Sequence, residues 1–132
     1  MEPILHLSIP VGDLDESREF YVDMLGCAPG HEGPGGMDVW FYGLQLTLQL
    51  QPDQLLSDEA QGVRHFGVTL DRATLEALLA RLEHFPVRWL SRVSTDTTGA
   101  LRGKTGAKVA DPSGNVLEFK TYDDPTAALG RP

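Results

Sequence analysis

Alternation of apolar and polar residues predicts several β-strands along the chain. Residues Leu44–Pro52 read LQLTLQLQP, in which leucine alternates with glutamine or threonine, so this segment has one apolar and one polar face. The same period of two occurs in Ile4–Val11 and in Val63–Leu70, and each of these strands carries a histidine, His6 or His65. Alternation alone leaves open whether the polar face of LQLTLQLQP contacts water or lines a site.

Two helices are predicted by apolar residues at helical spacing. The first has Asp15 as its N-cap and ends at Gly26, and the second is capped by Asp71. The apolar face of the first helix comprises Phe20, Tyr21, Met24 and Leu25. That of the second comprises Leu75, Leu78, Leu79, Leu82 and Phe85.

The segments between these elements have the composition of loops, linkers and further strands. Gly- and Pro-rich Cys27–Asp38 is predicted as a loop, Val39–Gln51 as a hairpin divided at Gly43, and polar Gln51–Gly62 as a linker. Further on we expect a strand at Val87–Val93, a loop at Ser94–Gly106, and two strands at Ala107–Ala110 and Asn115–Tyr122. A type I turn, Asp111–Gly114, joins the last two strands.

The order of elements repeats, since β-α-β-β-β is written twice. His6 aligns with His65, and Gln49 aligns with Glu118 when LTLQLQ is set over NVLEFK; the extra residues of the second half then fall in Ser94–Gly106. We therefore predict an α+β fold of two βαβββ modules that form a cupped mixed β-sheet with helices outside. Residues 1–132 form one domain, with module one at about 3–52, a linker at 53–62, module two at 63–124 and a tail at 125–132.

Composition narrows the possible functions. The 132 residues carry a net charge of −8, without a run of Lys or Arg, so nucleic-acid binding is not expected. The longest apolar runs are too short to cross a membrane, and the first residues, MEPILHL, do not resemble a targeting peptide. A single cysteine, Cys27, cannot form an internal disulfide, which fits a cytoplasmic protein.

Four polar residues on the repeated strands form a candidate site. If each module curls into half of a cup, the side chains of His6, His65, Gln49 and Glu118 point into one hollow. Two histidines and one carboxylate with open positions suit a divalent first-row metal. Each residue alone also fits a structural explanation, as a hydrogen-bonded histidine or part of a solvated strand face. Their coincidence under one repeat favours the shared site.

Both ends of the chain resemble a known superfamily. The segment HLSIPVGDLDESREFYVDMLG, with His6, Phe20-Tyr21 and Leu25-Gly26, is similar to the opening of vicinal oxygen chelate proteins. These include glyoxalase I, extradiol dioxygenases, and fosfomycin- and bleomycin-resistance proteins. The closing segment VADPSGNVLEFKTY is similar to the Asp-Pro-x-Gly turn and ligand-bearing strand of these proteins.

The resemblance implies a metal triad of His6, His65 and Glu118 that binds Ni, Zn, Fe, Mn or Co. It also implies a small-molecule substrate that chelates the metal through vicinal oxygens, and a homodimer. Gln49 stands where glyoxalase I enzymes usually have a glutamate, and a glutamine cannot act as a base at neutral pH. Glu118 and Gln49 are the expected catalytic residues, and the expected substrate contacts are Gln49, Thr47, Gln45, Ser8 and Lys104.

Several reactions remain open under this resemblance. A glyoxalase-type lyase or isomerase is the first, and an extradiol-type dioxygenase, which uses the same triad with iron(II), is an alternative. A fosfomycin-type thiol transferase needs cationic groups, for which Arg102, Lys104 and Lys108 are the available cluster. The last alternative is a non-catalytic protein that sequesters a ligand, as bleomycin-resistance proteins do. Retention of all three ligands favours an enzyme.

Overall fold

The computed structural model describes residues 1–95 and 103–130. These residues form two compact units. Unit 1 comprises Met1–Val63 together with Asp111–Asn115, and unit 2 comprises Arg64–Ala110 and Val116–Pro132.

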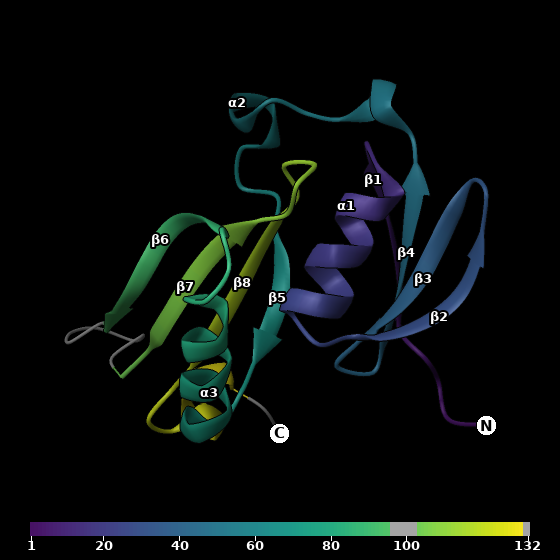
Figure 1. Cartoon of the computed structure of the whole chain (residues 1–132). Coiled ribbons are helices and arrows are strands. Elements are labelled where there is room, and N and C mark those ends of the chain that lie inside the picture. The colour runs from purple at the N-terminus through teal and green to yellow at the C-terminus, as the bar shows by residue number, and fades with distance from the viewer. Residues whose placement is uncertain (96–102, 131–132) are drawn as a thin grey trace. The chain divides into compact units, whose positions relative to one another are not determined.

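Unit 1 is a mixed four-stranded sheet with a helix on one face (Figure 1). The strand order is β1-β4-β3-β2; β1 runs parallel to β4, and the other neighbours are antiparallel. The strands are β1 (His6–Val11), β2 (Ala28–Gly33), β3 (Gly36–Phe41) and β4 (Leu44–Leu50). The helical run comprises α1 (Leu14–Arg18) and the π-helical turn η1 (Glu19–Met24).

The core of unit 1 forms because the apolar residues of its strands share one face. Leu46 and Leu48 of β4 are fully buried, whereas Gln45, Thr47 and Gln49, which alternate with them, are not. The helix adds Phe20, Tyr21 and Met24 to this core, as its apolar spacing predicts. The sheet therefore keeps a second, polar face, which carries the alternate residues of LQLTLQLQP.

A tight hairpin connects β3 and β4. Tyr42 and Gly43 both have positive φ, 49° and 84°, which is the backbone signature of a two-residue type I′ turn. Gly43 divides the predicted hairpin as expected, and the register it sets places Asp38 opposite Thr47.

Unit 2 repeats the arrangement, with strand order β5-β8-β7-β6 and parallel pairing between β5 and β8. Its strands are β5 (Phe66–Thr69), β6 (Arg88–Thr95), β7 (Thr105–Ala110) and β8 (Val116–Thr121). Helix α3 (Arg72–Leu82) has Asp71 as its N-cap and buries four leucines, as predicted: Leu75, Leu78, Leu79 and Leu82. The α+β class and the doubled βαβββ order are thus confirmed, as two mixed four-stranded sheets.

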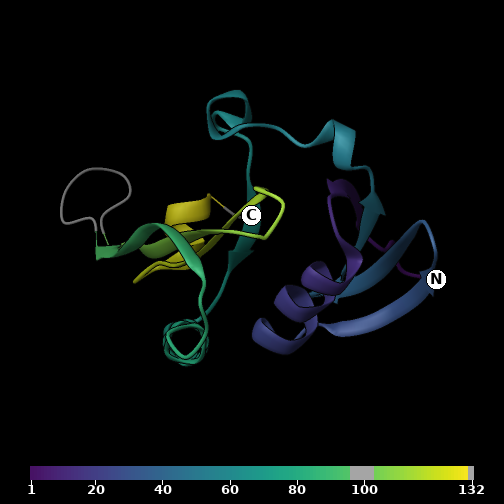
Figure 2. The ribbon, with the colours of Figure 1, turned by 45° about the horizontal axis from the view of Figure 1, so that its top comes forward.

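Short helices lie in the segments outside the two sheets. The predicted linker contains the 3-10 turn η2 (Pro52–Gln54) and α2 (Asp58–Gln61), both visible in the teal segment after β4 (Figure 2). The predicted tail begins with α4 (Pro125–Leu129). Among the described residues, no helix has the length and apolar character needed to cross a bilayer.

Two sequence-based predictions about local structure were wrong. Cys27–Asp38 is not a loop, since it contains β2 and the start of β3. β2 is an exposed edge strand with a bulge between Pro29 and Glu32, so neither its composition nor its burial pattern marks it as a strand. The N-cap of α1 is Asp13 rather than Asp15, because Asp13 has extended backbone geometry and its carboxylate accepts the Glu16 N–H at 2.9 Å.

The turn after β7 packs within unit 1. Gly114 N–H donates to Asp111 O at 3.0 Å, which closes the predicted turn. The Tyr21 hydroxyl donates to the buried Asp111 carboxylate at 2.7 Å, and the Asn115 amide donates to Pro10 O at 2.9 Å. Burial raises the pKa of Asp111, against the lowering effect of hydrogen bonds from Asn115 and Tyr21. Burial and the neighbouring Asp111 charge also raise the pKa of Tyr21 well above its usual value.

Candidate functional site

Glu118 is the central polar residue of unit 2. It lies on β8 between Leu117 and Phe119, which are both fully buried, so its side chain faces the opposite side of the sheet from the core. Only 12% of the Glu118 side chain is exposed. A carboxylate with so little contact to water needs charged or hydrogen-bonding neighbours, and unit 2 supplies three.

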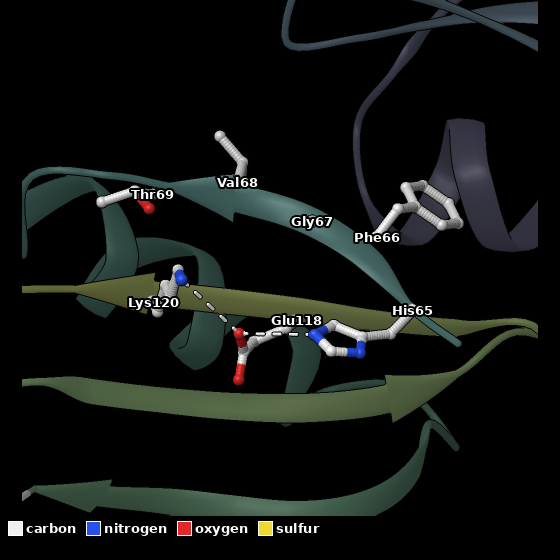
Figure 3. Close-up of a pocket in the computed structure, with 7 residues that line it drawn as sticks. All are labelled: His65, Phe66, Gly67, Val68, Thr69, Glu118 and Lys120. Carbon is white, nitrogen blue, oxygen red and sulfur yellow. Dashed lines mark ion pairs between the residues drawn. The ribbon is translucent and has the colours of Figure 1, made fainter. Parts of the chain in front are cut away.

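His65 is the first of these neighbours. The parallel pairing of Phe66 with Leu117 and of Gly67 with Glu118 brings the residue before β5 alongside β8. His65 Nε2 lies 3.8 Å from Glu118 Oε1. The two side chains point toward each other, while Phe66 and Val68 extend away from the carboxylate (Figure 3). Both belong to a cavity of about 220 Å³ lined by His65, Phe66, Gly67, Val68, Thr69, Glu118 and Lys120.

Gly67 makes this close arrangement possible. A Cβ atom at Gly67 would lie 1.8 Å from the Glu118 carbonyl oxygen and 2.9 Å from its backbone nitrogen. Since real Cβ atoms do not approach backbone atoms so closely, a side chain at position 67 would push β5 away from β8. Gly67 therefore sets the separation of β5 from β8, and with it the distance between Glu118 and His65, which immediately precedes β5.

Two lysines complete the surroundings of the Glu118 carboxylate. Lys104 Nζ lies 3.4 Å from Oε2, and Lys120 Nζ lies 3.9 Å from Oε1. Lys104 was predicted as a substrate contact, and the structure places it beside Glu118. Lys120 was not predicted as a site residue. It lies two residues after Glu118 on β8, and this spacing predicts that both side chains lie on the same face of the sheet. The cationic cluster expected from the sequence has two members besides Lys104. Lys108 lies on β7 and pairs in register with Glu118 on β8. Arg102 lies outside the described residues.

The polar face of unit 1 has its own hydrogen-bond network around Asp38. Thr47 Oγ1 donates to Asp38 Oδ1 at 2.7 Å, and Gln45 Nε2 donates to Oδ2 at 3.2 Å. Gln45 and Thr47, two of the predicted substrate contacts, are thus held by a carboxylate in the segment predicted to be a loop. Asp38 was missed because this strand was expected to begin at Val39, three residues after the start of β3.

Gln49 and Ser8 form a second polar pair on this face. The Gln49 amide donates to the Ser8 hydroxyl. Both residues line a smaller cavity of about 110 Å³, together with Ile9, Pro10, Gln51 and Gln54. His6, the first residue of β1, is exposed and pairs in register with Gln45 of β4.

The strand register shows that the two residue equivalences drawn from the sequence repeat, His6 with His65 and Gln49 with Glu118, do not hold together. Ser8 pairs with Thr47 in unit 1, and Gly67 pairs with Glu118 in unit 2. If His6 corresponds to His65, then Ser8 corresponds to Gly67, and Thr47 rather than Gln49 occupies the position of Glu118. Gln49 then corresponds to Lys120. The alignment of Gln49 with Glu118 is therefore shifted by two residues, which is the spacing of side chains on one face of a strand.

The donor atoms of unit 2 fit part of a metal site. Two ligands bound to one transition-metal ion lie about 3–3.5 Å apart, so the His65 nitrogen and the Glu118 oxygen need only a sub-ångström movement to share an ion. Within residues 1–95 and 103–130, no cluster of three or more His, Cys, Asp or Glu side chains is assembled. His6 belongs to unit 1, and its role as a third ligand stays a prediction. The ammonium groups of Lys104 and Lys120 repel any metal ion that binds at Glu118, so a bound metal needs compensating negative charge.

Comparison with known proteins identifies the family. Residues 3–119 match the model of the Glyoxalase/Bleomycin resistance protein/Dioxygenase superfamily. The chain belongs to this superfamily. Most of its members are enzymes, many depend on a metal, and small-molecule binding is typical of them. None of the curated proteins matches the chain.

Solved structures agree with this assignment. The chain is similar to a glyoxalase/bleomycin resistance protein/dioxygenase from Alicyclobacillus acidocaldarius, with 32% identity, a TM-score of 0.85 and coverage of 95% of each chain. It also has the fold of the fosfomycin resistance protein FosX from Listeria monocytogenes, with 12% identity, a TM-score of 0.74 and coverage of 92% and 93%. An integron cassette protein from V. cholerae matches with 25% identity, a TM-score of 0.62 and coverage of 93% and 97%.

Proposed function

We propose that this superfamily member is a metal-dependent enzyme of the glyoxalase type, a lyase, isomerase or transferase. Its substrate is a small molecule that presents two vicinal oxygens. The observation that supports this most is the His65–Glu118 pair, an imidazole nitrogen and a carboxylate oxygen that face each other at 3.8 Å at a cavity. These donor types suit a divalent first-row transition metal such as Ni, Zn, Fe, Mn or Co.

In this proposal His65, Glu118 and His6 are the metal ligands. A bound metal supplies Lewis acidity that stabilises negative charge on the substrate oxygens. Gly67 keeps β5 close enough to β8 for the first two ligands to act together.

The remaining polar residues bind and orient the substrate. Gln49 is a hydrogen-bonding group rather than a base, since its amide cannot take up a proton at neutral pH. Its amide already donates to Ser8, which orients it on the polar face of unit 1. Gln45 and Thr47 are oriented in the same way by Asp38. Glu118, which bears the negative charge in the cavity of unit 2, is the proposed catalytic carboxylate.

Metal analysis of protein purified without a chelator tests the proposal. We expect near-stoichiometric transition metal in the wild type and its loss in both His65→Ala and Glu118→Ala. His84→Ala, which removes an exposed histidine of unit 2 next to α3, serves as the matched control and should keep the metal. A protein that stays metal-free after soaking with Mn, Fe, Ni or Zn would contradict the proposal.

Activity assays then separate the candidate reactions. A hemithioacetal substrate tests glyoxalase-type isomerisation, a catechol tests extradiol cleavage, and fosfomycin with a thiol tests transfer. If the protein is an isomerase of glyoxalase descent, Gln49→Glu should raise or create hemithioacetal turnover, because a carboxylate can carry the proton that an amide cannot. The homodimer implied by the superfamily resemblance is part of the same proposal, and light scattering of the purified protein measures it.

A further inference from the structure

The surroundings of the Glu118 carboxylate have a local charge opposite to that of the whole chain. The chain carries a net charge of −8. Around Glu118, however, one carboxylate faces two ammonium groups, those of Lys104 and Lys120, at 3.4 and 3.9 Å. With His65 neutral, this group of side chains has one positive charge in excess.

The two lysines have more hydrogen-bonding capacity than Glu118 can use. Each ammonium group has three N–H donors, so the pair presents six, whereas a carboxylate has about four acceptor positions. His65 also approaches the same carboxylate. Donors therefore remain beside Glu118 for an anionic ligand.

Both lysines are held in place by their surroundings. Lys104 and Lys120 are only 23% and 26% exposed. The Lys120 ammonium also lies 5.4 Å from the ring centroid of buried Tyr122, a cation–π contact. Lys104 follows Gly103, whose φ of +83° is a backbone conformation that favours glycine. The ammonium groups are thus partly desolvated and oriented, which strengthens their interaction with an anion.

We propose that Lys104 and Lys120 form a subsite for the anionic oxygen group of the ligand, a carboxylate, phosphonate or phosphate, beside Glu118, at the cavity of unit 2 that Glu118 and Lys120 line. One part of this proposal rests on the proposed function: we expect the anion to bind cooperatively with a metal at His65 and Glu118. A divalent metal alone raises the local charge from +1 to +3, and a dianion returns it to +1. By linkage, each ligand must strengthen the binding of the other to the same extent.

Titration of metal-free protein with methylphosphonate, inorganic phosphate and acetate tests the subsite. We expect saturable binding of at least one of these probes at low ionic strength by calorimetry, and the comparison tells a phosphorus oxyanion from a carboxylate. Lys104→Met and Lys120→Met should each weaken that binding at least tenfold. Arg72→Met removes one positive charge from unit 2 at an exposed ion pair with Asp123 and should leave the affinity unchanged. Absence of saturable binding, or an equal loss in Arg72→Met, would overturn the subsite.

A second titration tests the coupling, with Ni²⁺ in the presence and absence of saturating probe anion. We expect the anion to lower the Kd of Ni²⁺ about tenfold. In the Lys104→Met/Lys120→Met double variant, Ni²⁺ should bind more tightly by itself and show no dependence on the anion. A Kd of Ni²⁺ that is independent of the anion in the wild type would overturn the coupling and leave the proposed function standing. Anion binding without any Ni²⁺ binding would instead overturn the proposed function and leave the subsite standing.

Discussion

Individual residues of unit 1 show how burial changes acid–base chemistry in this protein. The hydroxyl of Tyr21 and the carboxylate of Asp111 share a buried hydrogen bond, and the Cys27 thiol is also buried. Burial disfavours the charged form of each group, so all three have a raised pKa. These residues stabilise the fold or fill the core, and Tyr21 and Asp111 lie in the helix and turn segments that most resemble the superfamily.

The Cys27 thiol should be unreactive in the folded protein. Burial raises its pKa from 9.0 to about 11. At pH 8 the thiolate fraction is then about 100-fold lower than in the unfolded chain, and thiolate is the reactive form. We expect thiol–disulfide exchange with a chromogenic disulfide reagent to be slower in the native protein than in the urea-unfolded protein by at least this factor. Equal rates in the two states would show that the thiol is accessible and ionises normally.

Replacement of Tyr21 by Phe should destabilise the protein and change its response to alkaline pH. Asp111 loses a buried donor, so we expect a loss of about 1–3 kcal/mol in the free energy of unfolding at pH 7. Above pH 10 the unfolded chain loses the Tyr21 proton, while the folded protein retains it because the folded pKa is raised. Stability therefore falls with rising pH, by about 1.4 kcal/mol per unit for this group.

Urea unfolding of the wild type and Tyr21→Phe between pH 9 and about 11.5 measures this effect. Cys27 contributes to the decline in both proteins, so the difference between the two curves isolates Tyr21. The two proteins should converge in stability as pH rises above 10. Parallel curves would mean that Tyr21 ionises as readily in the folded protein as in the unfolded chain.

At the scale of elements, the parallel strand pairs position the candidate residues. β5 pairs with β8, and β1 pairs with β4, so each histidine approaches the polar face of a neighbouring strand. The pairing in unit 2 depends on Gly67, where the backbones come too close for a side chain. Strand packing and site geometry are therefore linked at a single residue.

Gly67→Ala should disrupt both the stability and the site of unit 2. Its Cβ would require β5 to move away from β8, which we expect to cost about 2–3 kcal/mol in unfolding free energy. The same movement separates His65 from Glu118 and should weaken metal binding. Gly33→Ala, in β2, is the matched control, since a Cβ there meets nothing within 4 Å and should change stability by less than about 0.5 kcal/mol. Similar stabilities of the two variants would contradict the role of Gly67.

The elements also show what the sequence can and cannot predict. Strands with one buried face, such as β4 and β8, and helix α3 with its four buried leucines were predicted because burial imposes a visible period. β2 was missed because an exposed, bulged edge strand containing Pro29 and Gly30 has no such period. Lys120 could have been predicted as a neighbour of Glu118, because alternate residues of a strand lie on the same face. The link between Asp38 and Thr47 could not, because it depends on the register of the β3–β4 hairpin.

At the scale of the whole molecule, the sequence repeat predicted the doubled fold but not the details of equivalence. Histidine equivalence and strand register together place Thr47, not Gln49, at the position of Glu118. Unit 1 thus has a neutral residue where unit 2 has its carboxylate, and two lysines surround that carboxylate. This asymmetry concentrates the candidate chemistry in unit 2. The organisation of residues 1–132 as a single domain stays a prediction.

The proposed function requires that His65 and Glu118 together bind a divalent transition metal. Titration of metal-free protein with Co²⁺, followed by visible absorption, tests it most directly, because the d–d bands report the ligands and their geometry. We predict saturation at one Co²⁺ per chain, with affinity reduced at least tenfold in both His65→Ala and Glu118→Gln and unchanged in His84→Ala. Bands that fail to appear, or that persist with the same affinity in His65→Ala and Glu118→Gln, would contradict the claim.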